Sequence, residues 1–223
     1  MKVKVNNLIN KQAEICSRLF INGKGNFISI LPPKDFNFEE CLVFLARSQN
    51  EVLHEVRDDA FFKLIKIRNE LILLKVTREN EMIRIEFPEQ NLDKERKLSA
   101  ALYIWDLFDL GRELDDFYEL GEKDSIVNPL IKKYYGLRVI GIPDLFEALC
   151  WAIMGQQINL AFAYSLKRKF VEKYGESLHS QNKVYWHFPD PSIIAKLDVS
   201  DLTSMQFTSR KAEYVLGVAK LLA

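Results

Sequence analysis

The spacing of apolar residues changes from a two-residue period to a helical period near residue 90, and this change limits the folds open to the chain. Residues 81–87 alternate polar and apolar side chains as a half-buried strand does, and Pro88 ends the run. Beyond them, Leu98, Leu102 and Trp105 recur at the spacing of one helix face. The change predicts an α+β fold, with an antiparallel sheet and helices first and an all-helical part after it.

The front of the chain is predicted to form strands around one helix. Asn37 suits the N-cap of a helix over residues 38–47, whose first turn is acidic. Short polar pairs at residues 58–59 and 69–70 suit tight turns between strands. The predicted strands cover residues 26–31, 51–57, 61–67, 71–77 and 81–87.

The rest of the chain is predicted to be helical. Pro143 fits the first turn of one helix, Gly175 is a natural stop after another, and Thr208 or Ser209 caps the last. The predicted helices cover residues 92–107, 114–120, 128–135, 143–154 and 158–174, with a short helix from residue 192 and a last one from residue 208 or 209. We therefore expect two domains, residues 1–90 and residues 91–223. Because the last helix reaches the final residue without a cap, we expect the chain to be incomplete at that end.

Composition restricts the class of protein. Hydrophobic residues make up 48% of the chain, which is enough for a buried core, so disorder is not expected. Cys16, Cys41 and Cys150 show neither a disulfide framework nor metal-ligand spacing, and we interpret them as reduced, buried thiols. No apolar segment follows the first seven residues, and no run approaches the roughly 20 apolar residues of a membrane span. A cytoplasmic protein is expected.

The sequence contains no common catalytic or cofactor-binding motif. A glycine-rich phosphate loop, GxSxG and HExxH are all missing, and His54, His179 and His187 are scattered, the last two flanking an expected loop. We interpret the carboxylates of residues 113–116 as a solvated helix face. The sequence therefore predicts no metal site and no cofactor.

One segment is unusual. Gly155, Gln156 and Gln157 interrupt two otherwise apolar helices within residues 137–159. Polar residues at such a break are expected to be exposed, and a glycine allows a backbone or a ligand to approach closely. These residues alone leave two interpretations open, a plain polar turn between helices and a functional turn.

The residues around this turn follow a recognisable order. Gly136-Leu137-Arg138 comes first, then Pro143, Phe146-Glu147 and the run 153–158, and the order continues through residues 161–175, 188–191 and 210–213. This stretch resembles the helix–turn–helix pair of AlkA-type DNA-3-methyladenine glycosylases in the helix-hairpin-helix DNA glycosylase superfamily. Residues 31–36 and 44–47 resemble the start of the AlkA N-terminal domain. The resemblance implies an antiparallel sheet domain followed by a helical glycosylase domain.

The resemblance also implies a partner and a mechanism. Such proteins bind double-stranded DNA, flip an alkylated base out of the stack and cut its N-glycosidic bond. Flipping the base costs a few kcal/mol. Gln157 takes the position of the wedge that fills the gap, with Gly155, Gln156 and Ile158 in the DNA-contacting turn. Some relatives carry leucine at the wedge, so Gln157 is a departure that would fill the gap less well but could hydrogen-bond the orphaned base.

An aromatic pocket for the flipped base is implied as well, because a cationic alkylated purine is attracted to aromatic faces. Phe44 resembles a pocket-wall phenylalanine of the family. The alternative, that Phe44 is ordinary core of its helix, stays open. Trp151 lies on the helix before the wedge, and we interpret it as core.

The catalytic residue implied by the resemblance is an aspartate that stabilises a positively charged transition state. In the family it follows a proline–glycine–isoleucine–glycine hairpin, which this sequence lacks. We therefore expect the catalytic aspartate beyond Ala223, and we assign no catalysis to Asp190, Asp198 or Asp201.

The expected function is that of a base-excision repair hydrolase that removes 3-methyladenine-like purines from DNA. The 223-residue chain alone is expected to be inactive, and neither a metal nor an obligate protein partner is implied. Two alternatives are a naturally non-catalytic DNA-damage-binding protein and a helical interaction module unrelated to DNA.

Overall fold

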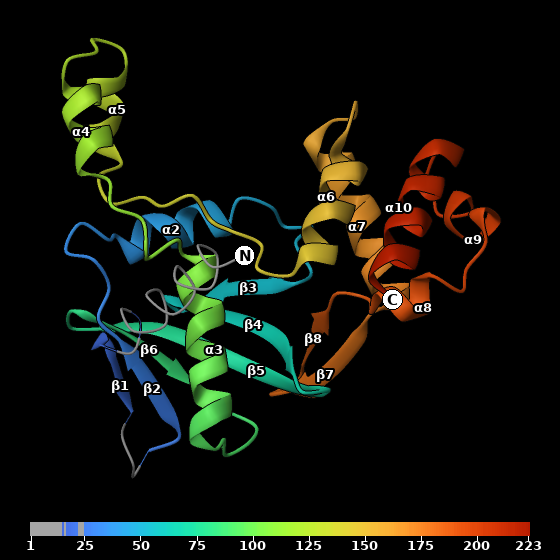
Figure 1. Ribbon diagram of the computed structural model, residues 1–223, viewed down its shortest axis with the longest axis horizontal. Helices are drawn as coiled ribbons and strands as arrows, with labels where there is room; N and C mark the ends of the chain where they lie inside the picture. The colour runs from blue at the N-terminus through green and yellow to red at the C-terminus, as the bar shows by residue number, and fades with distance from the viewer. Residues whose placement is uncertain (1–14, 16, 22–24) are drawn as a thin grey trace, which may run out of the picture. The chain divides into compact units, whose positions relative to one another are not determined.

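The computed structural model of the protein describes residue 15, residues 17–21 and residues 25–223. Within these residues it contains a six-stranded sheet, a two-stranded sheet and α-helices (Figure 1). The predicted α+β class is confirmed. The expectations for the first seven residues and for Cys16 lie outside the described residues. Along the described chain, no helix is both long enough and apolar enough to cross a membrane.

The larger sheet has the strand order β1-β2-β6-β5-β4-β3. Two tight turns connect neighbouring strands of this sheet, Asp58-Asp59 between β3 and β4 and Arg68-Asn69 between β4 and β5. All four residues have left-handed backbones, with φ between 50° and 66°. Such residue pairs form the turns whose twist matches a two-residue hairpin. The second turn falls one residue earlier than predicted. The strands are β1 (Leu19–Ile21), β2 (Phe27–Ile30), β3 (His54–Arg57), β4 (Ala60–Ile67), β5 (Glu70–Glu79) and β6 (Met82–Glu86).

The chain forms two compact units, each made of three segments. The first unit comprises the described residues up to 45, with 56–61 and 74–141. The second comprises residues 46–55, 62–73 and 142–223. The predicted domain division at residue 90 stays a prediction.

The first unit packs helices against strands around an aromatic core. Phe36, Phe38 and Phe61 each contact the ring of Phe108, with centroid distances of 5.6 to 5.8 Å. The predicted cap is confirmed, because Asn37 Oδ1 accepts the backbone N–H of Glu40 at 3.1 Å. The helices of this unit are α2 (Phe38–Leu45), α3 (Lys94–Leu107), α4 (Asp115–Glu122) and α5 (Val127–Lys133).

The second unit holds the helices of the unusual segment. Its core gathers Phe146 and Met154 with Phe170, Val215 and Ala219, all almost fully buried. The helices are α6 (Leu145–Gly155), α7 (Leu160–Tyr174), α8 (Pro191–Ile194), α9 (Val199–Thr203) and α10 (Ser209–Leu222). Pro143 lies outside α6, contrary to prediction, because Asp144 is the N-cap and accepts the backbone N–H of Glu147.

A β-hairpin interrupts the part that was predicted to be helical. Strands β7 (Glu176–Ser180) and β8 (Lys183–His187) pair antiparallel, with His179 opposite Val184. Gln181 and Asn182 form the turn with φ of 49° and 63°, so no glycine marks it in the sequence. His179 and His187 therefore lie in strands and do not flank a loop.

Candidate functional site

The turn between α6 and α7 is built by a cap on each side of it. Helix α6 ends at Gly155, and the N–H of Gln156 donates back to the Ile153 carbonyl oxygen. Helix α7 begins after Asn159, whose Oδ1 accepts the N–H of Phe162 at 2.8 Å. The residues between these caps are held in a tight connection. The structure thus brings Gly155, Gln156, Gln157 and Ile158 together in one turn.

The backbone of this turn is both open and constrained. A Cβ added at Gly155 would meet no atom within 4 Å, so packing within the protein does not require a glycine there. Gln157 is exposed and has a φ of 55°, a left-handed conformation that is uncommon for residues other than glycine. Gln156 is also exposed, whereas Ile158 is half-buried. Nine other non-glycine residues among those described also have a positive φ, several of them in hairpin turns, so the conformation of Gln157 reflects a tight turn.

A buried ion pair joins α7 to the segment that precedes β3. Lys167 Nζ contacts Glu51 Oε2 at 2.6 Å, and it lies 4.6 Å from the ring centroid of Trp151 and 5.0 Å from that of Tyr164. Burial alone would raise the pKa of Glu51, but Lys167, His54 and two hydrogen bonds lower it to about 2. Trp151 is half-buried and its ring centroid lies 5.0 Å from that of Tyr164, and its interpretation as core stays a prediction.

A second pair of buried charges lies nearby in the same unit. Lys63 Nζ is 3.7 Å from Glu147 Oε2, and both side chains are nearly inaccessible. Burial raises the pKa of Glu147, although Lys63 and Lys167 oppose that change. Desolvation lowers the pKa of Lys167. Glu147 belongs to the motif on which the resemblance rests, and here it is the buried partner of Lys63 in the first turn of α6.

Other motif residues also have structural roles. Gly136 has a φ of 82°, and a Cβ there would lie 2.1 Å from the Asp35 carbonyl oxygen, so no other residue fits without a shift. Arg138 is 1% exposed and donates to Asp35 Oδ1 at 2.7 Å and to the carbonyl oxygen of Arg112. Gly136 and Arg138 hold in place the last segment of the first unit, which ends at residue 141. In the α6–α7 turn, by contrast, Gly155, Gln156 and Gln157 are exposed.

Phe44 lies in the first unit. Its side chain is 39% exposed and lines a largely apolar hollow of about 370 Å³. Phe117, which is 52% exposed, shares this wall. The Asp109–Arg112 ion pair, at 2.6 Å, lies at the same hollow. Phe44 is therefore accessible to a planar ligand, and its role as a pocket wall stays a prediction.

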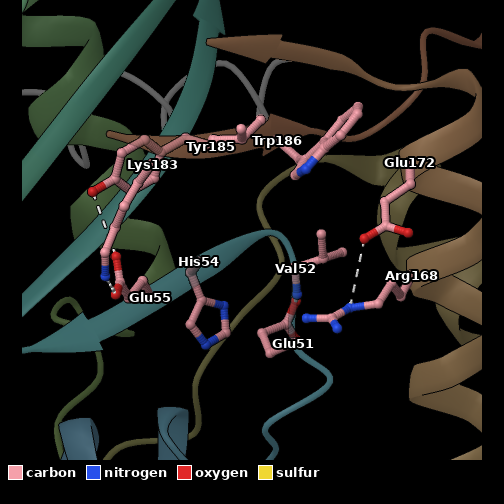
Figure 2. Close-up of a pocket in the computed structure, with 10 residues that line it drawn as sticks. Glu51, Val52, His54, Glu55, Arg168, Glu172, Lys183, Tyr185 and Trp186 are labelled. Atoms are coloured by element: carbon pink, nitrogen blue, oxygen red, sulfur yellow. Dashed lines mark hydrogen bonds and ion pairs between the residues drawn. The ribbon is translucent and has the colours of Figure 1, made fainter. Parts of the chain in front are cut away.

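A second hollow, of about 360 Å³, belongs to the second unit. Figure 2 shows Lys183 directed toward Glu55 and Arg168 directed toward Glu172. The hydroxyl of Tyr185 also donates to Glu55. Since these charges satisfy one another, we assign no ligand to this hollow.

The described cysteine, histidine and acidic side chains form no cluster that could bind a metal ion. Among residues 15, 17–21 and 25–223, no three His, Cys, Asp or Glu side chains gather as metal ligands would. Cys41 and Cys150 are free and buried, and burial raises the pKa of both thiols, that of Cys41 to about 11. A raised pKa keeps a thiol in its protonated form, which is the less nucleophilic one.

Sequence reasoning missed the buried ion pair of α7. Lys167 and Glu51 are 116 residues apart, and neither stands in a motif that predicts the other. The helical spacing of Tyr164 and Lys167, which places them on one face of α7, was the only signal available.

Two family models cover most of the chain. Residues 150–223 match the HhH-GPD superfamily base excision DNA repair protein model, and residues 29–149 match the 8-oxoguanine DNA glycosylase N-terminal domain model. The second match covers more than half of the chain. The α6–α7 turn falls within the first match and Phe44 within the second.

Individual proteins give a consistent result. A DNA-3-methyladenine glycosylase of Bacillus subtilis (strain 168) is 41% identical over 203 residues, which are 89% of this chain and 67% of the relative. The solved 3-methyladenine DNA-glycosylase from Archaeoglobus fulgidus superposes with a TM-score of 0.75 at 22% identity, over 86% of this chain and 66% of that one.

A Clostridium acetobutylicum 8-oxoguanine glycosylase/lyase, solved with double-stranded DNA, superposes with a TM-score of 0.65 at 16% identity, over 90% of this chain and 64% of that chain. At such identities the two solved structures establish the fold alone. The chain spans about two thirds of the length of each of these three proteins. From the family models and the 41% identical relative, the chain belongs to the DNA-3-methyladenine glycosylases of the HhH-GPD superfamily of base excision DNA repair proteins.

Proposed function

We propose that this chain binds double-stranded DNA that contains an alkylated base and inserts Gln157 into the gap left by the flipped nucleotide. The observation that carries the proposal is the α6–α7 turn, where exposed Gln157 is held at a φ of 55° two residues after an uncrowded Gly155. A flipped base leaves an unpaired partner, and the amide of a glutamine can donate and accept hydrogen bonds there.

The proposed ligand of the hollow beside Phe44 is an alkylated purine of the 3-methyladenine class. An alkylated purine carries positive charge, which the face of an aromatic ring attracts. The name of the B. subtilis relative supports this lesion. The 8-oxoguanine N-terminal domain model that matches residues 29–149 makes oxidised guanine the second candidate lesion.

None of the aspartates after Gly155 in this chain is assigned to bond cleavage. Asp190 Oδ1 accepts the backbone N–H and the hydroxyl of Ser192 as the N-cap of α8. Asp198 and Asp201 form the capping box of α9. Since each of these carboxylates already holds a helix end, we propose that the 223-residue chain binds damaged DNA without hydrolysing the N-glycosidic bond.

A binding comparison between two matched variants tests this proposal. Gln181 is a suitable control for Gln157, since it is an exposed glutamine with a φ of 49° in the same unit. Fluorescence anisotropy would compare a duplex containing a tetrahydrofuran abasic analogue with the intact duplex. We expect Gln157→Ala to reduce the preference for the abasic duplex roughly tenfold and Gln181→Ala to leave it unchanged.

The same measurements separate the alternatives. Equal binding of both duplexes by the unmodified chain would contradict damage recognition, and a lack of salt-dependent DNA binding would favour an unrelated interaction module. Release of 3-methyladenine from alkylated DNA by this chain would contradict the proposal that the chain binds damaged DNA without hydrolysing the N-glycosidic bond. A longer family protein that binds damage without any excision would favour the non-catalytic alternative.

A cytoplasmic location is part of this proposal. Two free, buried thiols at Cys41 and Cys150 support it, because reduced cysteines are typical of proteins in reducing compartments.

A further inference from the structure

A lysine from α10 reaches the end of helix α6, directly before the turn that carries Gln157. Lys211 Nζ donates a hydrogen bond to the backbone carbonyl oxygen of Met154 at 2.8 Å. The last four carbonyl groups of an α-helix lack partners within the helix. Met154 is the penultimate residue of α6, so Lys211 satisfies one of these carbonyls and places a positive charge at the negative end of the helix.

The base of Lys211 is fixed to the rest of the second unit. Thr208 caps α10, and its Oγ1 accepts the backbone N–H of Lys211 at 3.3 Å. The next residue, Ala212, is fully buried in the core that also holds Met154 and Cys150. The ammonium group therefore connects two helices that already pack together, and the extra bond acts on the exposed end of α6.

The residues at that end of α6 make few interactions that would hold the turn in one conformation. Gly155 has no side chain and no neighbour that would restrain one, and Gln157 occupies a conformation that costs free energy. A residue that must enter a base stack has to be held in place before it meets the DNA. The Lys211 hydrogen bond lies three residues from Gln157 and restrains the carbonyl before the turn.

We propose that Lys211 is a positioning residue, which holds the α6–α7 turn in the conformation that presents Gln157 to the DNA. The part that concerns DNA rests on the proposed function of Gln157. The restraint of the turn does not, because it concerns the free protein. Lysine at this place could instead bind a DNA phosphate, and the two roles differ in what they predict.

A positioning role affects recognition of the damaged site, whereas a phosphate contact affects all DNA alike. Loss of one phosphate contact weakens binding uniformly and lowers the salt dependence by about one counterion. Loss of the restraint leaves binding to intact duplex largely unchanged and lowers the preference for a duplex with a gap in its stack.

The first experiment measures the free chain. Amide hydrogen exchange by mass spectrometry would follow the peptide spanning residues 154–158 in Lys211→Met, in Lys211→Arg, and in Lys220→Met as the control. Lys220 is an exposed lysine on the same helix. We expect exchange to rise roughly tenfold in Lys211→Met only, with the arginine variant restoring protection. Unchanged exchange in Lys211→Met would overturn the proposal.

The second experiment measures DNA binding by the same variants. Lys211→Met should lower the preference for the tetrahydrofuran duplex over intact duplex about as far as Gln157→Ala does, roughly tenfold, while Lys220→Met leaves it unchanged. Equal weakening on both duplexes with a reduced salt slope would mark a phosphate contact and contradict the positioning role. If Gln157→Ala itself left the preference unchanged, the proposed wedge would be wrong, and hydrogen exchange would still decide whether Lys211 restrains the turn.

Discussion

Lys167 Nζ lies 2.6 Å from Glu51 Oε2, and the two side chains are only 7% and 8% exposed. The pair joins helix α7 to the segment before β3, and the ring of Trp151 on α6 lies against the same ammonium group. A buried charge is tolerated when another charge and aromatic faces replace the lost water. The pair therefore fixes α7 to that segment, and the contact of Lys167 with Trp151 connects α7 to α6.

Removal of one partner should be strongly destabilising. Lys167→Met leaves the Glu51 carboxylate buried without its cation, and we expect the free energy of unfolding to fall by about 3 kcal/mol. Urea denaturation would measure the change. Lys123→Met is the control, since its pair with Glu119 is 69% and 72% exposed and should contribute less than about 0.5 kcal/mol. Similar effects of the two substitutions would show that the buried pair contributes no more than an exposed one.

The same pair should determine how the free energy of unfolding changes at low pH. The pKa of Glu51 is lowered from 4.5 to about 2 in the folded protein, so its contribution is complete above pH 4.5 and is lost as the pH falls toward 2. Glu51→Gln should flatten the decline of stability in that window relative to the unmodified chain. Thermal melts at intervals between pH 2 and pH 7 would check this, and an unchanged slope would contradict the lowered pKa.

His187 should act in a separate and higher pH window. Desolvation is the largest cause of the lowered pKa of His187, and nearby Lys63 adds to it. A proton then binds the unfolded chain more readily, so the contribution is present above pH 6.5 and is lost as the pH falls below it. His187→Phe should remove this part of the pH dependence and leave the Glu51 window in place. The same series of melts would resolve the two windows.

Gly155 should be dispensable for folding and required for binding DNA. Alanine fits there without a clash and favours the helix by up to about 1 kcal/mol. Gly217, in α10, is also open on all sides, so Gly217→Ala should stabilise the protein in the same way. We expect only Gly155→Ala to weaken anisotropy-measured binding to DNA, because a methyl group would obstruct a close phosphate. Equal DNA binding by both variants would remove the argument for close approach.

Phe44 should recognise the base without supporting the core. Phe44 is 39% exposed and neighbouring Val43 is 69% exposed, so alanine should cost about 2 kcal/mol at Phe44 and less than about 1 kcal/mol at Val43. Phe44→Ala should weaken binding of free 3-methyladenine roughly tenfold, measured by calorimetry, while Val43→Ala leaves it unchanged. If Phe44→Ala strongly destabilises the protein while the folded fraction binds the base as before, Phe44 is core.

Much of the local structure could be predicted from short sequence patterns. Asn37 and Thr208 cap the helices for which they were assigned, because a short polar side chain satisfies backbone groups wherever a helix starts. The strand over residues 82–86 followed from its alternation. The β7–β8 hairpin was missed, since Gln181 and Asn182 adopt left-handed backbones that no glycine announced.

By itself, the sequence determined the family, the α+β class and the place of the Gln157 turn, because these depend on local order and on a motif that is continuous in the chain. Only the tertiary structure decided which charges meet. With 31 basic and 31 acidic residues in the chain, the pairing of Lys167 with Glu51 could not be chosen by inspection. The same is true of Lys211 and the Met154 carbonyl, 57 residues apart. Long-range contacts depend on how helices pack, and packing is set by the whole core at once.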